Sequence, residues 1–276
     1  MARSARRALA LLALHALTGQ AAHAQDASQV PPRAAEAVNA LQSESWRAIE
    51  AGLDVLEVSS ALGTRLTALR LKDEAFRFAV LQADKAGGIT ARSGVEQSEA
   101  VLAVNGGFFA ARSDGKLVPV GMLIDDGQAR SQAWKDSGGY LTIDDKGRAD
   151  ILLTAAGPPD DAREAIQSRP VLIEPGGKWA MRTNTLDQER RTLFCRLDDG
   201  TSLLLVVSGQ GLSLYEAGWI LRGPRWGGFF DCDAAIALDG GSSTQLTIDG
   251  EWDLRVDPLL PVQNLLTVQR REAQSQ

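Results

Sequence analysis

The sequence is poor in histidine and cysteine, and these two shortages exclude several kinds of catalytic and metal site. The chain of 276 residues has two histidines, His15 and His23, and two cysteines, Cys195 and Cys232. Both histidines lie in a segment that resembles a secretory signal peptide, so the exported chain would contain none. Without histidine, no Ser-His-Asp or Cys-His catalytic pair forms, and histidine-ligated zinc or iron is excluded. Two cysteines cannot build a four-cysteine zinc or iron–sulfur site.

The first 24 residues have the three parts of a secretory signal. Three arginines precede the apolar run from Ala8 to Leu17, and Ala22-His23-Ala24 is a small-x-small cleavage site. We expect cleavage between Ala24 and Gln25, with the product periplasmic in a Gram-negative host or secreted. No later apolar run reaches the roughly 18 residues that span a bilayer, so we expect no membrane span in the mature chain.

Acidic residues outnumber basic ones, which argues against nucleic acid as a partner. The chain has 35 Asp and Glu against 29 Lys and Arg, and its net charge of −6 becomes −9 without the three arginines of the signal peptide. Affinity for DNA or RNA comes mainly from Lys and Arg on phosphates. An enzyme of this composition has to rely on carboxylates, arginine, hydroxyls and backbone amides. The sequence leaves the oligomeric state open.

The two cysteines have two interpretations that the sequence leaves open. In an oxidising compartment, Cys195 and Cys232 are able to form a disulfide. Their spacing does not reveal whether their Cα atoms come close enough. The alternative is a pair of small buried apolar side chains.

The order of predicted elements favours one domain built mainly of strands. Residues 25–44, polar and alanine-rich, are expected to form a leader or linker with a short helix near 34–41, followed by a single domain over 45–276. Strands are expected to flank the turn signals at Asp144–Gly147 and Asp198–Gly200. Further helices are expected at positions 93–100, 160–167 and 213–221. The predicted class is α+β, around a largely antiparallel or mixed β-sheet with a few packed helices.

Two glycine-rich segments follow buried strands and are candidates for a binding site. Asn105-Gly106-Gly107 combines an amide side chain with two glycines that let a ligand approach the backbone, although a turn between packed strands explains it equally well. Asp239-Gly240-Gly241-Ser242-Ser243 places a carboxylate before amides and hydroxyls that suit an anion. A plain hairpin loop is the alternative for this second segment, and we favour a functional interpretation.

Two further motifs have strong structural explanations when each is taken alone. Ser213-x-x-Glu216 is the capping-box pattern of a helix start, and the functional alternative is a second carboxylate presented to a site. Arg191, just before a strand, is able to bind phosphate in a bidentate manner but is more often a solvated surface charge.

Taken together and in this order, these segments resemble the phosphodiester glycosidase family over about residues 46–270. The matching blocks are Val104-Asn105-Gly106-Gly107-Phe108-Phe109, Gln167-Ser168-Arg169-Pro170-Val171-Leu172, Arg191-Thr192, Gly211-Leu212-Ser213-Leu214-Tyr215-Glu216-Ala217 and Leu238-Asp239-Gly240-Gly241-Ser242-Ser243. Arg169 departs from the glycine of the family's S-G-P-x-L segment, which changes the turn or brings a cation into the cleft. The stretch 222–231 is also unusual, and its aromatic residues Trp226, Phe229 and Phe230 either stack on a sugar or pack the loop.

The resemblance implies an exported hydrolase that cleaves the glycosidic bond of sugar-1-phosphodiesters, with N-acetylhexosamine-1-phosphodiesters as one candidate group. Asp239 and Glu216 are the expected catalytic carboxylates. The expected substrate-binding residues are Asn105, Gly106, Gly107, Arg191, Gly240, Gly241, Ser242 and Ser243. The substrate would be a sugar phosphate or a glycan of the cell envelope, such as an exopolysaccharide. We expect no cofactor and assign no metal ligands, and weak divalent metal binding stays open.

Two other functions fit the same residues. The first is a non-catalytic module that binds an envelope glycan or polyanion through the Gly/Ser loop and Arg191. The second is a phosphodiesterase that cleaves the P–O bond, with a divalent metal on the aspartates.

Overall fold

The computed structural model describes residues 29–272, apart from 85, 136, 158, 160, 251 and 253. The expected signal peptide, its cleavage site at Ala24–Gln25 and both histidines lie outside these residues, as do positions 25–28 of the expected leader. Among the described residues no helix is long and apolar enough to cross a membrane.

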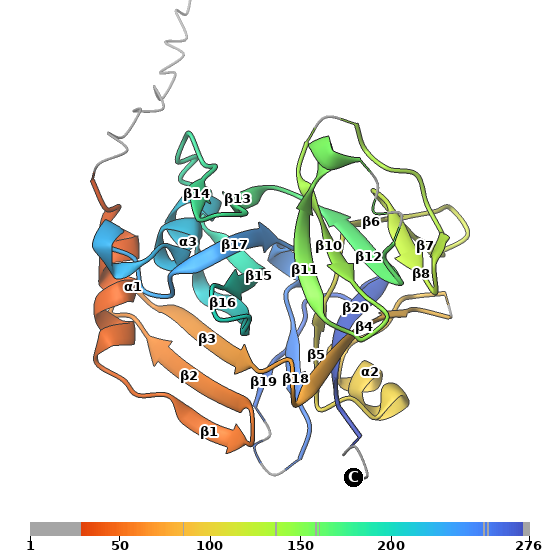
Figure 1. Cartoon of the computed structure of the whole chain (residues 1–276), viewed down its shortest axis with the longest axis horizontal. Coiled ribbons are helices and arrows are strands. Elements are labelled where there is room, and N and C mark those ends of the chain that lie inside the picture. The colour runs from red at the N-terminus through yellow and green to blue at the C-terminus, as the bar shows by residue number, and fades with distance from the viewer. Residues whose placement is uncertain are drawn as a thin grey trace, which may run out of the picture.

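Three antiparallel sheets and a small hairpin account for most of the described chain (Figure 1). The eight-stranded sheet contains, in spatial order, β1 (Arg47–Glu50), β2 (Leu53–Ser59), β3 (Thr64–Leu71), β16 (Ser202–Leu212), β15 (Glu189–Leu197), β17 (Cys232–Ala237), β13 (Val171–Glu174) and β14 (Lys178–Trp179). One five-stranded sheet contains β11 (Ala149–Leu153), β10 (Gly139–Ile143), β12 (Glu164–Ser168), β8 (Leu123–Asp125) and β9 (Gln128–Ala129). The other contains β19 (Arg255–Val256), β18 (Leu246–Ile248), β5 (Leu102–Asn105), β20 (Asn264–Arg270) and β4 (Phe76–Gln82).

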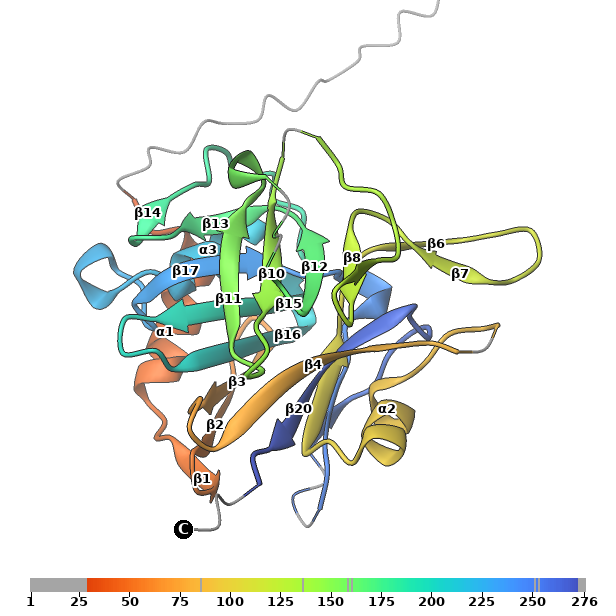
Figure 2. The ribbon, with the colours of Figure 1, turned by 45° about the vertical axis from the view of Figure 1, so that its right-hand side comes forward.

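The remaining elements are short. The hairpin of β6 (Phe109–Ala111) and β7 (Leu117–Pro119) extends away from the body of the molecule (Figure 2). The helices are α1 (Pro32–Gln42), α2 (Ala91–Ser98) and α3 (Leu214–Leu221), with short 3₁₀ turns η1 (Thr154–Ala156), η2 (Pro224–Trp226) and η3 (Gly241–Ser243).

The eight-stranded sheet is covered on both faces, and strand β16 shows how its sequence achieves this. Leu203, Leu205 and Val207 join the core shared with α1 and α3. Leu204 and Val206 point to the opposite face and join the core shared with the two five-stranded sheets. Because successive side chains of a strand alternate between faces, a continuous apolar run supplies two cores at once. This central sheet is therefore the rigid support from which the site loops leave.

Helix α1 belongs to the folded unit. Its residues Ala34, Ala37, Val38 and Leu41 are buried against the eight-stranded sheet and α3. The helix predicted within the leader segment is thus present, and the part of that segment from Pro32 onward packs into the core.

The predicted α+β class is broadly consistent with the structure, and the named strands pair in the antiparallel manner that was one of the two expected arrangements. The structure departs from the prediction in two respects. The chain is mostly β, with three sheets instead of one. The helix predicted over 160–167 is wrong, because Glu164–Ser168 forms strand β12. This strand pairs with β10 on one side and β8 on the other, and tertiary pairing of this kind overrides local helix propensity.

Candidate active site

The candidate site is centred on Asp239 and the loop that follows it, at the point where the chain leaves the core after β17. Asp239 is partly buried, and its carboxylate accepts hydrogen bonds from the Gly240 amide, at 2.9 Å, and from the Ser243 hydroxyl. Burial raises the pKa of the Asp239 carboxyl above that of an ordinary aspartate, and these two hydrogen bonds oppose the shift. No ion pair with the described residues offsets the cost of the buried charge.

Two glycines of this loop are required by its backbone. A Cβ on Gly240 would lie 2.9 Å from the Arg190 carbonyl oxygen, and Gly241 has φ of +58°, which disfavours other residues. The amides of Gly241 and Ser242 make no hydrogen bond to the described residues, whereas Ser243 and Thr244 complete the η3 turn. The loop therefore presents two N–H groups beside the Asp239 carboxylate.

Asn105 is a buried hub that joins three segments of the site. Its side-chain Nδ2 donates to the Asp239 carbonyl oxygen at 2.6 Å, and its Oδ1 accepts from the Thr192 hydroxyl at 2.6 Å and from the Gln245 amide at 3.2 Å. The residue has no exposed surface. The hydrogen-bonding groups of Asn105, which were expected to bind the substrate, are thus occupied by other groups of the protein.

Gly106 and Gly107 serve close packing of the chain. The Gly106 carbonyl accepts from the Asp239 amide at 3.0 Å, and a Cβ on Gly106 would lie 2.0 Å from Asn264 Oδ1. That same oxygen accepts from the Gly107 amide at 2.8 Å. The structure therefore brings Asn105, Gly106 and Asp239 together, with both glycines held beneath the Asp239 loop.

Arg191 lies at the start of β15, beside the Gly240 loop. Its Nε donates to the Leu212 carbonyl at 3.0 Å and its Nη2 to the Asp187 carbonyl at 2.6 Å. Its Nη1 makes no hydrogen bond to the described residues and lies 3.8 Å from the position of a Cβ on Gly240. Burial lowers the pKa of Arg191, and the nearby carboxylates of Asp187, Glu189 and Glu216 act in the opposite direction. Arg191 is thus a half-buried cation held by neutral carbonyls.

Glu216 caps helix α3, as its sequence pattern favours. Its Oε2 accepts from the Ser213 amide at 2.8 Å, and the Ser213 hydroxyl accepts from the Glu216 amide at 3.1 Å. The residue is 2% exposed. The electrostatic interaction between Glu216 and Arg191 places this carboxylate within the field of the candidate site.

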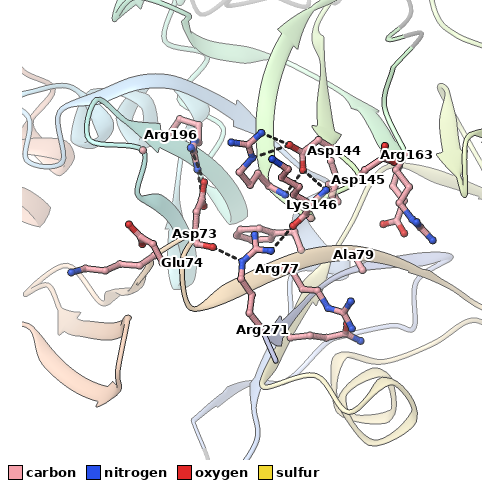
Figure 3. A pocket seen from close by; sticks show the side chains of 18 of the residues that line it. Asp73, Glu74, Arg77, Ala79, Asp144, Asp145, Lys146, Arg163, Arg196 and Arg271 are labelled. Atoms are coloured by element: carbon pink, nitrogen blue, oxygen red, sulfur yellow. Dashed lines mark hydrogen bonds and ion pairs between the residues drawn. The ribbon is translucent and has the colours of Figure 1, made fainter. Parts of the chain in front are cut away.

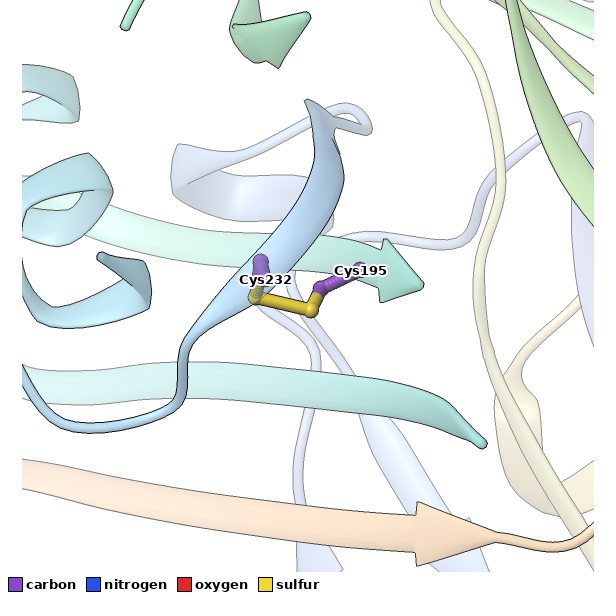
Figure 4. Close-up of a disulfide and its surroundings, with 2 residues drawn as sticks. All are labelled: Cys195 and Cys232. Atoms are coloured by element: carbon purple, nitrogen blue, oxygen red, sulfur yellow. A yellow bond between two sulfur atoms is a disulfide. The ribbon is translucent and has the colours of Figure 1, made fainter. Parts of the chain in front are cut away.

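A disulfide ties together the two strands that carry the site. Cys195 of β15 and Cys232 of β17 are bonded, with Cα atoms 5.9 Å apart (Figure 4). This settles the pairing that the sequence left open. Arg191 lies at one end of β15 and Asp239 follows β17, so the disulfide and the ladder between these strands fix the two groups relative to each other.

Sequence reasoning missed three residues that support the site. Thr192 holds Asn105 Oδ1, and its carbonyl accepts from the Leu238 amide at 2.9 Å. Asn264 Oδ1 accepts a hydrogen bond from the Gly107 main-chain amide, and the Gln245 main-chain amide donates one to Asn105 Oδ1. Only Thr192 lies in a recognised block. Asn264 begins β20 and Gln245 directly precedes β18, and neither is marked by a local sequence signal.

The aromatic stretch at 222–231 packs largely as a loop. Phe230 is 9% exposed and contacts Trp46 edge to face, with ring centroids 6.2 Å apart. Phe229 packs against Phe230 and the same core. Trp226 is exposed and lies beside Arg222 and Arg225.

A sizeable cavity lies elsewhere in the described structure. It is a groove of about 1270 Å³ between β4, the β10–β11 turn and the β15–β16 turn, and we call it the charged groove. Figure 3 shows two pairs of opposite charge within it. Arg196 forms two 3.0 Å hydrogen bonds to the carboxylate of Asp73, and Arg148 pairs with Asp144 at 2.7 Å. None of the family-like blocks contributes to it.

The site defined by this geometry combines the partly buried carboxylate of Asp239, one half-buried arginine and a loop of amides and hydroxyls on a β-rich support. Among the described residues no group of three or more His, Cys, Asp or Glu is arranged to hold a metal ion. Such a set of groups suits binding of an anionic substrate, with acid–base or nucleophilic chemistry by a carboxylate.

Comparison with known families agrees with this class of site. The sequence model of the phosphodiester glycosidase family matches residues 98–269, more than half of the chain. The chain therefore belongs to the phosphodiester glycosidase family. The match includes each candidate residue discussed above, from Asn105 to Ser243.

Three solved structures illustrate the similarity of fold. A hypothetical protein from Synechocystis has a TM-score of 0.59 and 15% identity, over 79% of this chain and 62% of that chain. The catalytic domain of zebrafish N-acetylglucosamine-1-phosphodiester alpha-N-acetylglucosaminidase, auto-inhibited by its pro-peptide, has a TM-score of 0.58 and 14% identity, over 82% and 86%. A "putative exported protein" from Burkholderia pseudomallei K96243 has a TM-score of 0.56 and 14% identity, over 79% and 74%.

These identities establish a shared fold. The chain spans 62% of the length of the Synechocystis protein. No curated protein matches this chain.

Proposed function

We propose that the protein hydrolyses the glycosidic bond of sugar-1-phosphodiesters, in line with the activity that its family name describes. The observation that carries this proposal is the pairing of a buried, uncompensated Asp239 carboxylate with an arginine and free loop amides at the same strand ends. In the reaction, the C1–O bond breaks, the oxygen of water joins C1, and the phosphate monoester departs with the bonding electrons. The proton of the water passes to a carboxylate.

Asp239 is our candidate for the reacting carboxylate. It is the one carboxylate of the site that combines partial exposure with a raised pKa, and its orientation is fixed by Gly240 and Ser243. In its ionised form it is able to act as base, as nucleophile or as a stabiliser of positive charge developing at C1. All three roles require the ionised form at the start of the reaction.

Arg191 and the loop amides are our candidates for the phosphodiester-binding groups. Arg191 Nη1 and the amides of Gly241 and Ser242 have no hydrogen-bond partner among the described residues. Donors placed before the reaction at developing negative charge lower the barrier, most effectively where water is excluded. A phosphate monoester is also a good leaving group, which reduces the need for a strong general acid.

Asn105 and Glu216 are our candidates for positioning residues. Asn105 holds the main chain at Asp239, and Glu216 fixes the start of α3, where its charge opposes the lowering of the Arg191 pKa. We further propose export of the protein without a cofactor. The signal-like residues 1–24 and the name of the Burkholderia neighbour support export.

Hydrolysis in ¹⁸O-labelled water tests the reaction type. The purified protein is incubated with a panel of sugar-1-phosphodiesters that includes N-acetylglucosamine derivatives, alongside Asp239→Asn and Glu216→Gln. We expect label in the free sugar, loss of this product with Asp239→Asn, and a partial loss with Glu216→Gln. Label in the phosphate would instead establish P–O cleavage, and a repeat with EDTA would then show whether a metal is needed.

A binding assay separates the enzyme from a glycan-binding module. Unchanged product formation by Asp239→Asn would overturn the role given to that residue. Binding of the phosphodiesters without turnover, across the whole panel, would favour the non-catalytic function.

A further inference from the structure

A second cavity, distinct from the charged groove, is lined by segments that pack against the strand leading to Asp239. It has a volume of about 1010 Å³ and lies between the β10–β11 sheet and the β13–β14 hairpin, and we call it the side cleft. Its lining includes Phe108, Ser137, Thr154, Arg169 and Glu174. It therefore combines an aromatic ring, hydroxyls and two charged groups.

Arg169 gives the side cleft a positive charge that the described residues leave unpaired. Glu174, the other charged residue of the lining, is paired with Lys178 at 2.7 Å. The Arg169 guanidinium forms no ion pair with the described residues, and its one hydrogen bond, to the Ser137 hydroxyl, is long at 3.5 Å. An exposed arginine without a carboxylate partner retains its capacity for bidentate binding of a carboxylate or phosphate.

Arg169 rests on a partly buried tryptophan whose main chain is held by a buried glutamine. Its guanidinium stacks on the Trp134 ring at 4.6 Å, and that ring contacts Phe108 at 5.7 Å between centroids. The Trp134 main chain is bound on both sides by the side chain of Gln167, which is 1% exposed and accepts from the Trp134 amide at 2.7 Å. Stacking on an aromatic ring reduces the side-chain freedom that arginine would lose on binding.

Two chain segments connect the side cleft to Asp239. Ser168 and Pro170, which flank Arg169, both bond to Ala237, two residues before Asp239. Phe108 follows Gly106, whose carbonyl accepts from the Asp239 amide. Neighbouring strands are about 5 Å apart, so these contacts place the segment that carries Arg169 beside the strand that leads to Asp239.

We propose that the side cleft is a subsite for an anionic group of the substrate, located beyond the phosphodiester and bound by Arg169. The preferred substrate class is then a sugar-1-phosphodiester whose leaving group carries a carboxylate or a further phosphate. This inference rests on the proposed function for the identity of the phosphodiester. The recognition of a second anion by Arg169 does not depend on the bond that is cleaved.

Matched probes test the subsite. Three N-acetylglucosamine-1-phosphodiesters are compared whose leaving groups have similar size and end in a hydroxyl (3-hydroxypropyl), a carboxylate (2-carboxyethyl) or a phosphate (2-phosphoethyl). We expect the wild type to favour the charged probes about tenfold in kcat/KM, a typical effect of one charge-assisted bidentate contact. We expect Arg169→Gln to abolish this preference with less than a twofold change for the hydroxyl probe, and Arg169→Lys to retain part of it. The carboxylate and phosphate probes distinguish the two sources of charge.

Arg225→Gln is the matched control. Arg225 is also exposed and close to a tryptophan ring, at 5.7 Å from Trp226, but it lies in η2, away from the cleft. We expect this variant to keep the full preference. A high salt concentration should reduce the preference of the wild type, because exposed charges are screened.

Calorimetric titration of Asp239→Asn with the same probes keeps the two proposals separable. Tighter binding of the charged probes that depends on Arg169 would support the subsite. If the wild type at the same time hydrolyses none of the probes, the proposed function would be overturned while the subsite stands. Absence of any preference of the wild type for the charged probes, in both turnover and binding, would overturn the subsite.

Discussion

The candidate site and the charged groove both gather charged residues, but they treat those charges differently. In the charged groove, Arg196 binds the carboxylate of Asp73 directly, and Arg148 binds Asp144. In the candidate site, Asp239 is held by an amide and a hydroxyl, and Arg191 by two carbonyls. These two pairs of the groove neutralise each other's charge, whereas the site holds opposite charges in place with neutral partners.

The same difference appears in the direction of the pKa shifts of these charged groups. Burial raises the pKa of Asp239 and lowers that of Arg191, so each charge is costly where it stands. Asp144 shows the opposite shift, because hydrogen bonds and the charge of Arg148 lower its pKa against a burial effect. An uncompensated charge is available to a substrate, and a compensated one stabilises the fold. Cavity size alone would have pointed to the groove.

The largest effect that tests this contrast is expected from Asp239→Asn. The substitution removes the proposed reacting carboxylate and should lower kcat about 100- to 10,000-fold, the range of a positioned acid–base group. Stability at neutral pH should be maintained or increased, because the variant removes a buried charge. Release of free sugar and thermal unfolding, measured on the same preparation, check both outcomes. A variant that loses activity only through unfolding would contradict the contrast.

The same carboxylate predicts a pH dependence with a defined sign. Asp239 must be ionised to react, so kcat/KM should fall as the solution is acidified through its raised pKa, at a higher pH than for an ordinary aspartate. For folding, a raised pKa means that the contribution of Asp239 is fully present below its unfolded-state pKa and is lost as pH rises through the folded-state pKa. Denaturation of wild type and Asp239→Asn at several pH values should therefore show a gap in favour of the variant that widens with rising pH. A gap independent of pH would contradict the assigned shift.

Removal of the disulfide should test how firmly the two strands of the site are held. A Cys195→Ala, Cys232→Ala double variant opens a link with a sequence separation of 37 and should lose about 2–4 kcal/mol of unfolding free energy. Urea denaturation with and without reductant measures the loss. Reductant should affect the wild type and leave the double variant unchanged, and equal sensitivity of both proteins would argue against the bond.

Asn105→Ala should show whether Asn105 positions Asp239 or contacts the substrate directly. The change leaves the Thr192 hydroxyl, the Gln245 amide and the Asp239 carbonyl without their buried partner, at a cost of about 1–3 kcal/mol in stability. We expect a lower kcat with little change in KM, because Asn105 positions Asp239. A selective increase in KM would instead indicate direct contact with the substrate. Steady-state kinetics below the unfolding transition distinguish the two results.

Local signals accounted for most of the elements that the sequence predicted correctly. The hairpins β10–β11 and β15–β16 form around the turns at Asp144–Gly147 and Asp198–Gly200. Ser213 and Glu216 cap α3 as their spacing predicts. The helix predicted over 160–167 is wrong because the conformation of β12 is determined by its pairing with β8 and β10. These two partner strands lie outside residues 164–168, so the local sequence does not reveal the pairing.

The sequence was sufficient to identify the motifs of the site, but not the role of each residue within it. The sequence identified Asn105 and Asp239, which the structure joins by a hydrogen bond. It assigned Asn105 to the substrate, because an amide side chain serves a ligand and a protein partner equally well. Burial decides between these uses, and burial depends on Gln245 and Asn264, which lie far along the chain.

The smallest expected effect comes from Asp73→Asn in the charged groove, and it completes the contrast. Asp73 and Arg196 are 18% and 17% exposed in their side chains, so the substitution weakens a half-shielded pair and should cost about 1–2 kcal/mol of stability. Turnover should be unchanged, since none of the family-like blocks contributes to the groove. The result would be the mirror image of Asp239→Asn, with stability lost and activity kept. A turnover that falls with Asp73→Asn below the unfolding transition would instead make the groove part of the functional site.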